Sequence, residues 1–183
     1  MKKSELRKIY HQKRAELTPS EKKKLEENIF QQIIDFEVNH IKNVHLFLSL
    51  KKFNEIDTQP IIDYFRNQNK QIIISKCNFE NNSLSHFIFD EKTELVKNKF
   101  GVLEPINAKQ ILEKEIDLIF VPLLISDEKN YRVGYGKGFY DKFLSKCRKD
   151  AKKIGLNFFK PVEEIEDINS FDISLNNVIY PKN

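Results

Sequence analysis

Two apolar runs constrain what this chain can fold into more than any other feature of its sequence. Residues 72–74 are all isoleucine, and residues 116–125 are apolar except for Asp117 and the proline Pro122. A half-exposed strand alternates apolar and polar residues, whereas a strand buried on both faces, as in a parallel sheet between helices, is apolar throughout. We therefore predict buried strands at Gln71–Cys77 and Ile116–Ile125. Because proline cannot donate to a sheet ladder, the second strand should end or bend at Pro122.

The rest of the chain alternates strands with helices after two N-terminal helices. Apolar residues recur at helical spacing along the first helix, and Thr18, Pro19 and Glu21 form the capping signal that begins the second. The other expected strands are Val44–Leu50, Leu84–Phe89, Lys153–Phe159 and Asn177–Tyr180, and the other expected helices are 58–65 (capped by Thr58), 92–98, 108–114 and 138–149. This order predicts a three-layer α/β fold with a mostly parallel central sheet and an N-terminal helical pair, in a single domain over residues 1–183.

Composition excludes several classes of protein. No segment approaches the roughly 20 apolar residues of a membrane-spanning helix, and the N-terminus lacks the apolar region of a signal peptide. Cys77 and Cys147 are too far apart in sequence to suggest a zinc pair, and two thiols make no disulfide framework. We expect a cytoplasmic monomer that binds neither a membrane nor a nucleic acid. Metal-ligand spacing is also missing from the four histidines, which we interpret as surface or core residues: His11, His40, His45 and His86.

Positive charge is concentrated at the N-terminus. Residues 1–24 hold nine Lys or Arg against three Glu, an excess of six, while the net charge of the whole chain is only +4. This segment either meets phosphates or a polyanionic substrate tail, or it is the solvated face of a helix.

The chain contains five glycines, and three of them lie within the five residues Gly134–Gly138. The cluster follows a buried strand and precedes a helix, which is where ligands bind in open α/β sheets. Backbone N–H groups at a helix start, with Arg132 and Lys137 beside them, suit a phosphate; the alternative is a glycine-rich structural turn. Asp141 in the first turn of that helix either compensates the helix dipole or holds Mg²⁺ against phosphate oxygens.

The cluster matches neither common nucleotide motif. Phe139 follows Gly138 where a Walker loop requires Lys-Ser/Thr after its glycine, and the third glycine comes one residue too early for the dinucleotide fingerprint. The same region does resemble a known family. Val121–Asp127 followed by Tyr131–Asp141 is similar to the signature of the 5-formyltetrahydrofolate cyclo-ligase family. Four further stretches resemble that family in the same order along the chain: 3–7, 47–58, 100–105 and 171–175.

The resemblance implies a role for particular residues. Lys137 and Arg132 would act on the transferring phosphate of ATP, with Lys137 the closer. Four residues would line the folate pocket: Leu48, Glu55, Phe100 and Tyr135. Asp141, with Asp172 opposite, would carry Mg²⁺. The implied ATP-binding residues are Lys3, Ser4, Glu5, Leu6, Arg7, Arg132, Val133, Gly134, Tyr135, Gly136, Lys137, Gly138, Phe139 and Tyr140.

The family's reaction, as the resemblance implies it, uses ATP to phosphorylate the formyl oxygen of 5-formyltetrahydrofolate. N10 then attacks the activated carbon, and 5,10-methenyltetrahydrofolate, ADP and phosphate are formed. Phosphoryl transfer depends mainly on positioning and charge neutralisation, which cations, backbone N–H groups and Mg²⁺ provide. Two rivals stay open: an RNA-binding module, although the chain lacks the common RNA motifs, and an ATP-dependent ligase that acts on another substrate.

Overall fold

The computed structural model describes residues 1–182, and its helices and strands follow the predicted order except at residues 92–98 and 108–114. The helices are α1 (Lys3–Glu16), α2 (Pro19–Ile34), α3 (Gln59–Asn67) and α4 (Phe139–Lys146), with short 3-10 turns η1 (Lys51–Phe53) and η2 (Glu113–Glu115). The strands are β1 (Asn43–His45), β2 (Gln71–Asn78), β3 (Ser83–Ile88), β4 (Glu94–Lys97), β5 (Leu103–Ile106), β6 (Gln110–Ile111), β7 (Leu118–Pro122), β8 (Ile125–Ser126), β9 (Arg132–Val133), β10 (Lys152–Leu156) and β11 (Asn177–Ile179).

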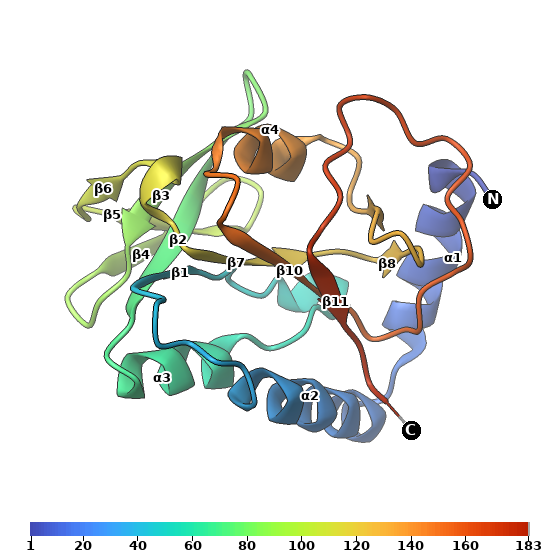
Figure 1. The fold of residues 1–183 in the computed structure, drawn as a ribbon, viewed down its shortest axis with the longest axis horizontal. Coiled ribbons are helices and arrows are strands. Elements are labelled where there is room, and N and C mark those ends of the chain that lie inside the picture. The colour runs from blue at the N-terminus through green and yellow to red at the C-terminus, as the bar shows by residue number, and fades with distance from the viewer. Residues whose placement is uncertain (183) are drawn as a thin grey trace.

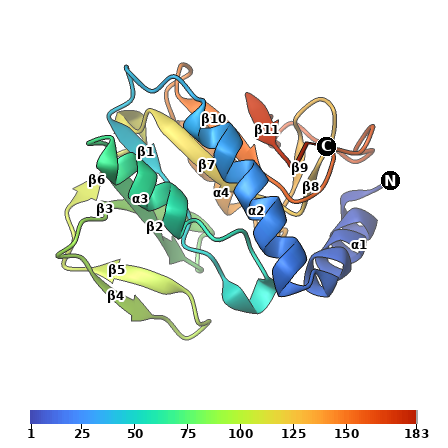
Figure 2. The same ribbon diagram turned by 90° about the horizontal axis from the view of Figure 1, so that it is seen from below.

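A seven-stranded sheet forms the centre of the molecule, in the order β11-β10-β7-β1-β2-β3-β6. The five strands from β11 to β2 are parallel, and β3 and β6 extend this sheet through antiparallel pairing. Helices α2 and α3 cover one face and α4 covers the other, while α1 lies beside β8 at one end (Figures 1 and 2). The predicted three-layer α/β class with an N-terminal helical pair is confirmed.

The apolar runs are buried on both faces, as their composition predicts. Ile72 and Ile74 pack into the cluster beneath α2 and α3, whereas Ile73 packs into the cluster beneath α4. In β7, Phe120 joins the first cluster and Val121 the second. Side chains of adjacent strand residues point to opposite faces of the sheet. A run without polar residues therefore supplies apolar side chains to the cores on both faces.

Helix α2 begins with the predicted capping box. The Thr18 hydroxyl accepts from the backbone N–H of Glu21, and the Glu21 carboxylate accepts from that of Thr18. The cap expected before α3 is different. Thr58 stands at the right position, but its hydroxyl donates to the Phe47 carbonyl at 2.6 Å. Asp57 instead accepts from the N–H of Gln59, so one residue earlier supplies the cap.

The helices predicted at 92–98 and 108–114 are wrong. Residues 94–97 form β4, which pairs antiparallel with β5, and residues 110–111 form β6 at the edge of the main sheet. Only a 3-10 turn, η2, falls within the second range. Both ranges are rich in Glu and Lys, which favour helices weakly, and pairing with a neighbouring strand overrides so small a local preference.

Several predicted strands are shorter than expected; the one predicted at Lys153–Phe159, for example, ends at Leu156 as β10. Only Asn43–His45 joins the ladder as β1, and the chain from Leu46 to Leu50 leaves the sheet toward η1. The run 116–125 divides at Pro122 as predicted: β7 ends there, and Ile125–Ser126 pairs with β9 in a separate hairpin. This division moves the chain out of the sheet at its carboxyl edge, where the glycine cluster follows.

Gly155 in β10 has no room for a side chain, so substitution there should destabilise the fold. A Cβ added there would lie 2.6 Å from Leu123 Cδ2 and 2.8 Å from Leu175 Cδ1. We expect Gly155→Ala to lower the free energy of unfolding by about 1–3 kcal/mol, because the core must shift to accept a methyl group. Urea titration measures this loss. Gly134→Ala, where no atom lies within 4 Å of the added Cβ, is the control for a tolerated methyl group. Equal stability of the two variants would contradict the prediction.

Two histidines are buried together beneath α4. Ser75 Oγ lies 2.7 Å from His45 Nε2 and 3.0 Å from His86 Nδ1. Burial lowers the pKa of His86 to about 4 and lowers that of His45 well below its usual value. The sequence left open whether these residues lie at the surface or in the core, and exposures of 0% and 1% place both in the core.

Burial of neutral histidines makes the fold sensitive to acid. The unfolded chain takes up protons below about pH 6.5, so stability is complete above that pH and is lost as the pH falls toward about 4. His86 alone should cost about 2 kcal/mol of unfolding free energy at about pH 5. Urea titrations of His86→Asn should show a shallower loss between neutral pH and pH 5 than wild type. The exposed His40→Asn is the control, and an identical pH slope in all three proteins would refute the prediction.

Candidate active site

The glycine cluster is an exposed loop between β9 and α4. Gly136 and Gly138 have φ of +89° and +72°, in the left-handed region that favours glycine, and Gly138 is the residue before the first turn of α4. No atom lies within 4 Å of a Cβ added at Gly138. Lys137 between them is exposed. The loop therefore presents a cation and the free N–H groups of a helix start to open space, as an anion site requires.

Helix α1 contacts this loop directly. Arg7 Nε donates to the Gly134 carbonyl at 2.9 Å, and its guanidinium lies 3.2 Å from a Cβ added at Gly136. Leu6 is buried with Val133 in the small cluster below the loop, so its side chain packs in the core. Ser4 and Glu5 are exposed. The structure thus brings the basic N-terminal segment and the glycine cluster together, although they are more than 120 residues apart in sequence.

Both predicted metal ligands lie near the loop, each in an ion pair. Arg132 Nη2 is 2.8 Å from Asp141 Oδ1, and its Nη1 donates to the Ile173 carbonyl at 2.6 Å. Asp172 Oδ2 lies 2.5 Å from Lys3 Nζ and accepts from the N–H of Asn169. Arg132 is buried, and its guanidinium is held between α4 and the segment before β11. Both of its terminal nitrogens have partners, and the ion pair orients the Asp141 carboxylate.

A magnesium ion fits these carboxylates only together with phosphate oxygens. Within residues 1–182, no three His, Cys, Asp or Glu side chains gather into a metal-binding group. Mg²⁺ commonly uses one or two carboxylates with substrate phosphates, so two aspartates beside an anion loop are an adequate donor set. The hydrogen bonds to Asp141 fall on Oδ1 and those to Asp172 on Oδ2, which leaves the second oxygen of each as a candidate ligand.

Tyr135 joins the loop to a buried carboxylate. Its hydroxyl donates to Glu55 Oε1 at 2.5 Å and accepts from Arg14 Nη2 at 2.6 Å. Glu55 Oε2 accepts from the N–H of Leu50 at 2.7 Å. Glu55 is only 4% exposed, and this burial raises its pKa above the usual range. Two residues predicted for one pocket, Tyr135 and Glu55, are therefore in contact.

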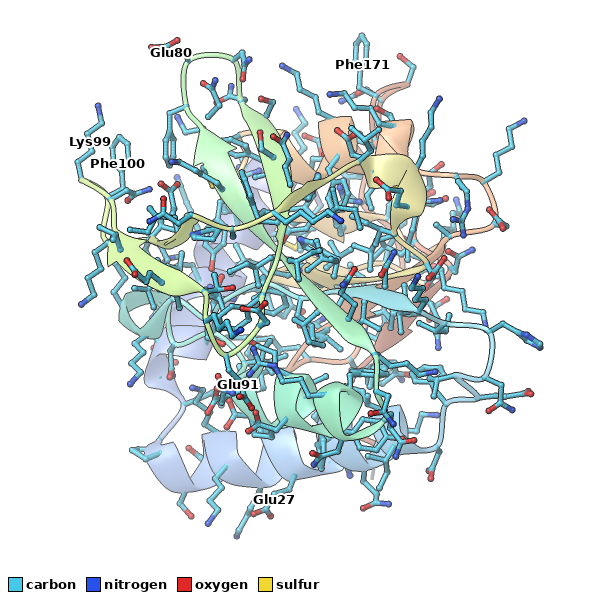
Figure 3. All side chains as sticks on the ribbon, turned by 90° about the vertical axis from the view of Figure 1, so that its left-hand side faces the viewer. Glu27, Glu80, Glu91, Lys99, Phe100 and Phe171 are labelled. Carbon is cyan, nitrogen blue, oxygen red and sulfur yellow. The ribbon has the colours of Figure 1, made fainter. Side chains whose placement is uncertain are left out.

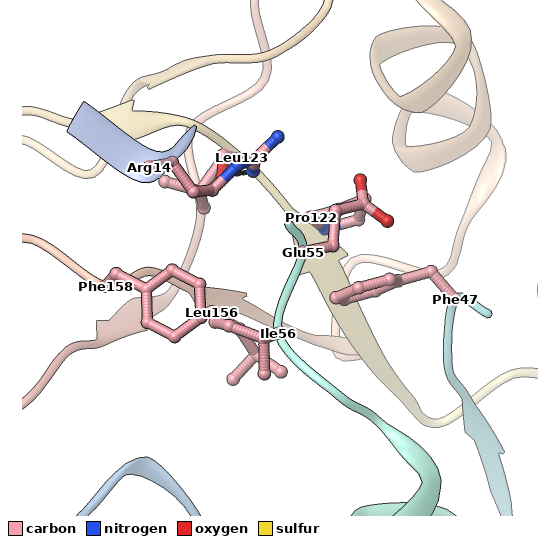
Figure 4. A pocket seen from close by; sticks show the side chains of 8 residues that line it. All are labelled: Arg14, Phe47, Glu55, Ile56, Pro122, Leu123, Leu156 and Phe158. Carbon is pink, nitrogen blue, oxygen red and sulfur yellow. Dashed lines mark hydrogen bonds between the residues drawn. The ribbon is translucent and has the colours of Figure 1, made fainter. Parts of the chain in front are cut away.

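A small hollow opens beside this contact. Its lining residues are Arg14, Phe47, Glu55, Ile56, Pro122, Leu123, Leu156 and Phe158 (Figure 4). The space is about 210 Å³ and partly open to solvent, smaller than the pocket that a folate needs. Leu48, the neighbour of Phe47, packs against the core beneath it. Arg14 and Glu55, which line the hollow, are the two residues that bond to the Tyr135 hydroxyl of the loop.

Phe100, the remaining residue predicted for the folate pocket, does not line this hollow and has an aromatic neighbour that the sequence did not suggest. It is 44% exposed, and its ring centroid is 4.3 Å from that of Phe79 in the turn after β2. Phe79 in turn lies 5.5 Å from Phe139 at the start of α4. Figure 3 shows Phe100 beside Lys99 at the outer edge of the molecule, and Lys52 donates to the Phe100 carbonyl. Exposed aromatic rings beside an anion loop suit a flat heterocyclic substrate.

Sequence reasoning missed Arg14 as well as Phe79. Arg14 is one of nine cations in residues 1–24, and composition does not distinguish it from the others. One signal was present: Arg7 and Arg14 are seven residues apart, so two helical turns place them on the same side of α1. For Phe79, a turn residue, we find no signal in the sequence.

This geometry defines a class of protein: an open α/β protein whose glycine-rich, cation-flanked loop follows the carboxyl edge of a parallel sheet. The chain belongs to the 5-formyltetrahydrofolate cyclo-ligase family, whose sequence model matches residues 1–181. The predicted resemblance is confirmed, and membership makes the chain a ligase of folate metabolism.

Individual relatives agree with this assignment. The chain is 32% identical to the 5-formyltetrahydrofolate cyclo-ligase of Mycoplasma genitalium, over 94% of this chain and 95% of that protein. It is 31% identical to the enzyme of the same name from Haemophilus influenzae, with 93% of each covered. The NMR structure of Aquifex aeolicus 5,10-methenyltetrahydrofolate synthetase matches with a TM-score of 0.83 at 29% identity, over 100% of this chain and 91% of that one. Among the helices described for residues 1–182, none is both long and apolar enough to cross a membrane.

Proposed function

We propose that this protein is a cytoplasmic enzyme that converts 5-formyltetrahydrofolate to 5,10-methenyltetrahydrofolate with ATP and Mg²⁺. One observation carries the proposal beyond family membership. The loop Gly134–Gly138 contacts Arg7 through the Gly134 carbonyl and, through Tyr135, the buried Glu55 carboxylate. A loop that contacts cations on one side and a carboxylate pocket on the other can hold a phosphate and a folate next to each other.

The nucleotide occupies the cationic side in this proposal. The exposed Lys137 faces the transferring phosphate, and the free N–H groups at the start of α4 donate hydrogen bonds to its oxygens. Lys3 and Arg7 neutralise the remaining phosphates, for which Lys3 exchanges its contact with Asp172 for a phosphate oxygen. Asp141 and Asp172 hold Mg²⁺, which neutralises negative charge on the phosphates when it is bound.

The folate occupies the side that contains Glu55, Tyr135, Leu48 and Phe100. The pterin or benzoyl ring packs on the exposed face of Phe100, while the Glu55 carboxylate accepts hydrogen bonds from substrate N–H groups. This arrangement directs the N5 formyl oxygen at the loop. Reacting atoms that are held in contact avoid most of the entropic cost of a bimolecular encounter.

The chemistry then follows from a poor leaving group. The oxygen of a formamide is a poor leaving group. The terminal phosphorus of ATP therefore bonds to that oxygen as the bond between this phosphorus and ADP breaks. N10 attacks the formyl carbon and loses its proton, and the carbon–oxygen bond breaks with phosphate as the leaving group. Lys137 and Arg132 stabilise the charge that develops on the transferring phosphoryl group.

The experiment that tests this function follows the absorbance of the methenyl product. Purified protein with 5-formyltetrahydrofolate and MgATP should produce that absorbance and equimolar ADP. Omission of ATP, or chelation of Mg²⁺ by EDTA, should abolish both signals. ATP turnover without methenyl product, or no turnover of either substrate, would contradict the proposal.

A further inference from the structure

Arg14 is the most completely buried cation of the molecule's described part, and it lies between the two sides of the site. Its exposure is 4%, while its neighbours Lys13 and Ala15 on α1 are exposed. A buried charge is unfavourable unless it is paired or well hydrogen-bonded. The partners of this guanidinium therefore indicate why the position holds arginine.

Those partners are few and specific. Arg14 Nη2 donates to the Tyr135 hydroxyl at 2.6 Å, and Nη1 lies 3.5 Å from the Leu123 carbonyl, at the limit of a hydrogen bond. Among the described residues Nε has no partner, although Arg14 lines the hollow next to Glu55 (Figure 4). A guanidinium that served stability alone would be expected to satisfy its donors with a direct carboxylate contact. Here the nearest carboxylate contact passes through a hydroxyl group.

The direction of this chain of hydrogen bonds is fixed by chemistry. Arginine can only donate, so the Tyr135 oxygen accepts from Arg14 and its single proton goes to Glu55 Oε1. The Leu50 N–H donates to Oε2, so both oxygens of Glu55 act as acceptors. Two accepted hydrogen bonds favour the ionised form of Glu55 and oppose the effect of its burial. Arg14 thus fixes the direction in which the Tyr135 hydroxyl donates, and its charge favours the ionised form of Glu55.

We propose that Arg14, through the hydroxyl of Tyr135, is a positioning residue that holds Glu55 as an oriented carboxylate for the folate and joins the folate side to the glycine-rich loop. This inference rests on the proposed function. The backbone of Arg14 supports it, because Asn54 Nδ2, next to Glu55 in sequence, donates to the Arg14 carbonyl at 2.8 Å. Helix α1 is thereby hydrogen-bonded both to Tyr135 in the glycine-rich loop and to Asn54 beside Glu55.

Loss of Arg14 should change the pH profile in a known direction. Burial raises the pKa of Glu55, while the hydroxyl of Tyr135 and the charges of Arg14 and Lys22 lower it; Tyr140 is the other titratable group nearby. Without the Arg14 cation, the carboxylate is less favoured and its pKa rises further. The acid limb of kcat/KM for folate should then move to higher pH.

The test compares wild type with Arg14→Met, Arg14→Lys, Tyr135→Phe and Lys13→Met in the methenyl assay. Arg14→Met should lower kcat/KM for folate by roughly 10- to 100-fold and move the acid limb upward, with KM for ATP nearly unchanged. Arg14→Lys keeps a positive charge, so its fall in kcat/KM and its shift of the acid limb should both be smaller than those of Arg14→Met. Lys13→Met removes an equal charge from the exposed side of α1 and should match wild type. Tyr135→Phe, which interrupts the same chain of contacts, should shift the limb in the same direction.

Each outcome decides the inference. If Arg14→Met does not fold, Arg14→Lys and Tyr135→Phe carry the test, and both must move the acid limb. An active wild type whose acid limb is unmoved in these variants would overturn the role of Arg14 alone. A wild type without methenyl production would overturn the proposed function, and this inference with it.

Discussion

Replacement of Lys137 by alanine should lower kcat by roughly 100- to 1000-fold while the protein stays folded. The side chain is exposed on the loop between two glycines of positive φ, so its removal leaves no cavity in the core. A preorganised cation at a transferring phosphoryl group commonly contributes an effect of this size, because it stabilises charge that is largest in the transition state. The measurement is kcat at saturating folate and MgATP, with thermal unfolding followed in parallel.

The matched control is Lys149→Ala, which removes an exposed lysine beyond the end of α4 and should retain the wild-type rate. It separates the local role of Lys137 from a loss of net charge. Wild-type kcat in the Lys137 variant would remove this residue from the mechanism. An equal loss in both variants would indicate long-range electrostatics as the cause.

Glu55→Gln should give the second large effect, a fall of roughly 100-fold in kcat/KM for folate. The substitution keeps the shape of the side chain but removes its charge, and the amide nitrogen cannot accept the hydrogen bond that Tyr135 or the Leu50 N–H donates. ATP affinity should change little, because the contacts of Lys137 and Arg7 are unaffected. Calorimetry with each ligand separately distinguishes the two affinities.

Glu27→Gln on the exposed side of α2 controls for the loss of one carboxylate. Figure 3 shows Glu27 at the outer surface of that helix. A Glu55 variant that bound folate as tightly as wild type would place the folate elsewhere. A variant that lost ATP affinity instead would assign Glu55 to the nucleotide side.

The elements that the sequence predicted well are those whose signal is independent of distant partners. The isoleucine run at 72–74 requires apolar surroundings on both faces, and Thr18 with Glu21 forms its capping box from four consecutive residues. The segments 92–98 and 108–114 carried no comparably strong signal. Their strands exist because of pairing with β5 and β3, which composition alone does not reveal.

The candidate site likewise has features that the sequence predicted and features that only the folded chain reveals. Glycine clustering after a buried strand predicted the loop, and Gly136 and Gly138 do adopt positive φ. The resemblance to the family assigned both Arg7 and the loop to ATP, but their direct contact joins segments far apart in the chain and was not predicted. The role of Arg14 depends on a hydroxyl more than 100 residues away, and only the folded chain brings them together.

Transfer of an oxygen isotope tests the central claim, that the terminal phosphate of ATP is transferred to the formyl oxygen of a folate held beside it. The enzyme is given MgATP and 5-formyltetrahydrofolate with oxygen-18 in the formyl group, and the released phosphate is analysed by mass. We predict one labelled oxygen in each phosphate released, because the formyl oxygen leaves the carbon while bonded to phosphorus. Methenyl product formed with unlabelled phosphate would contradict this account.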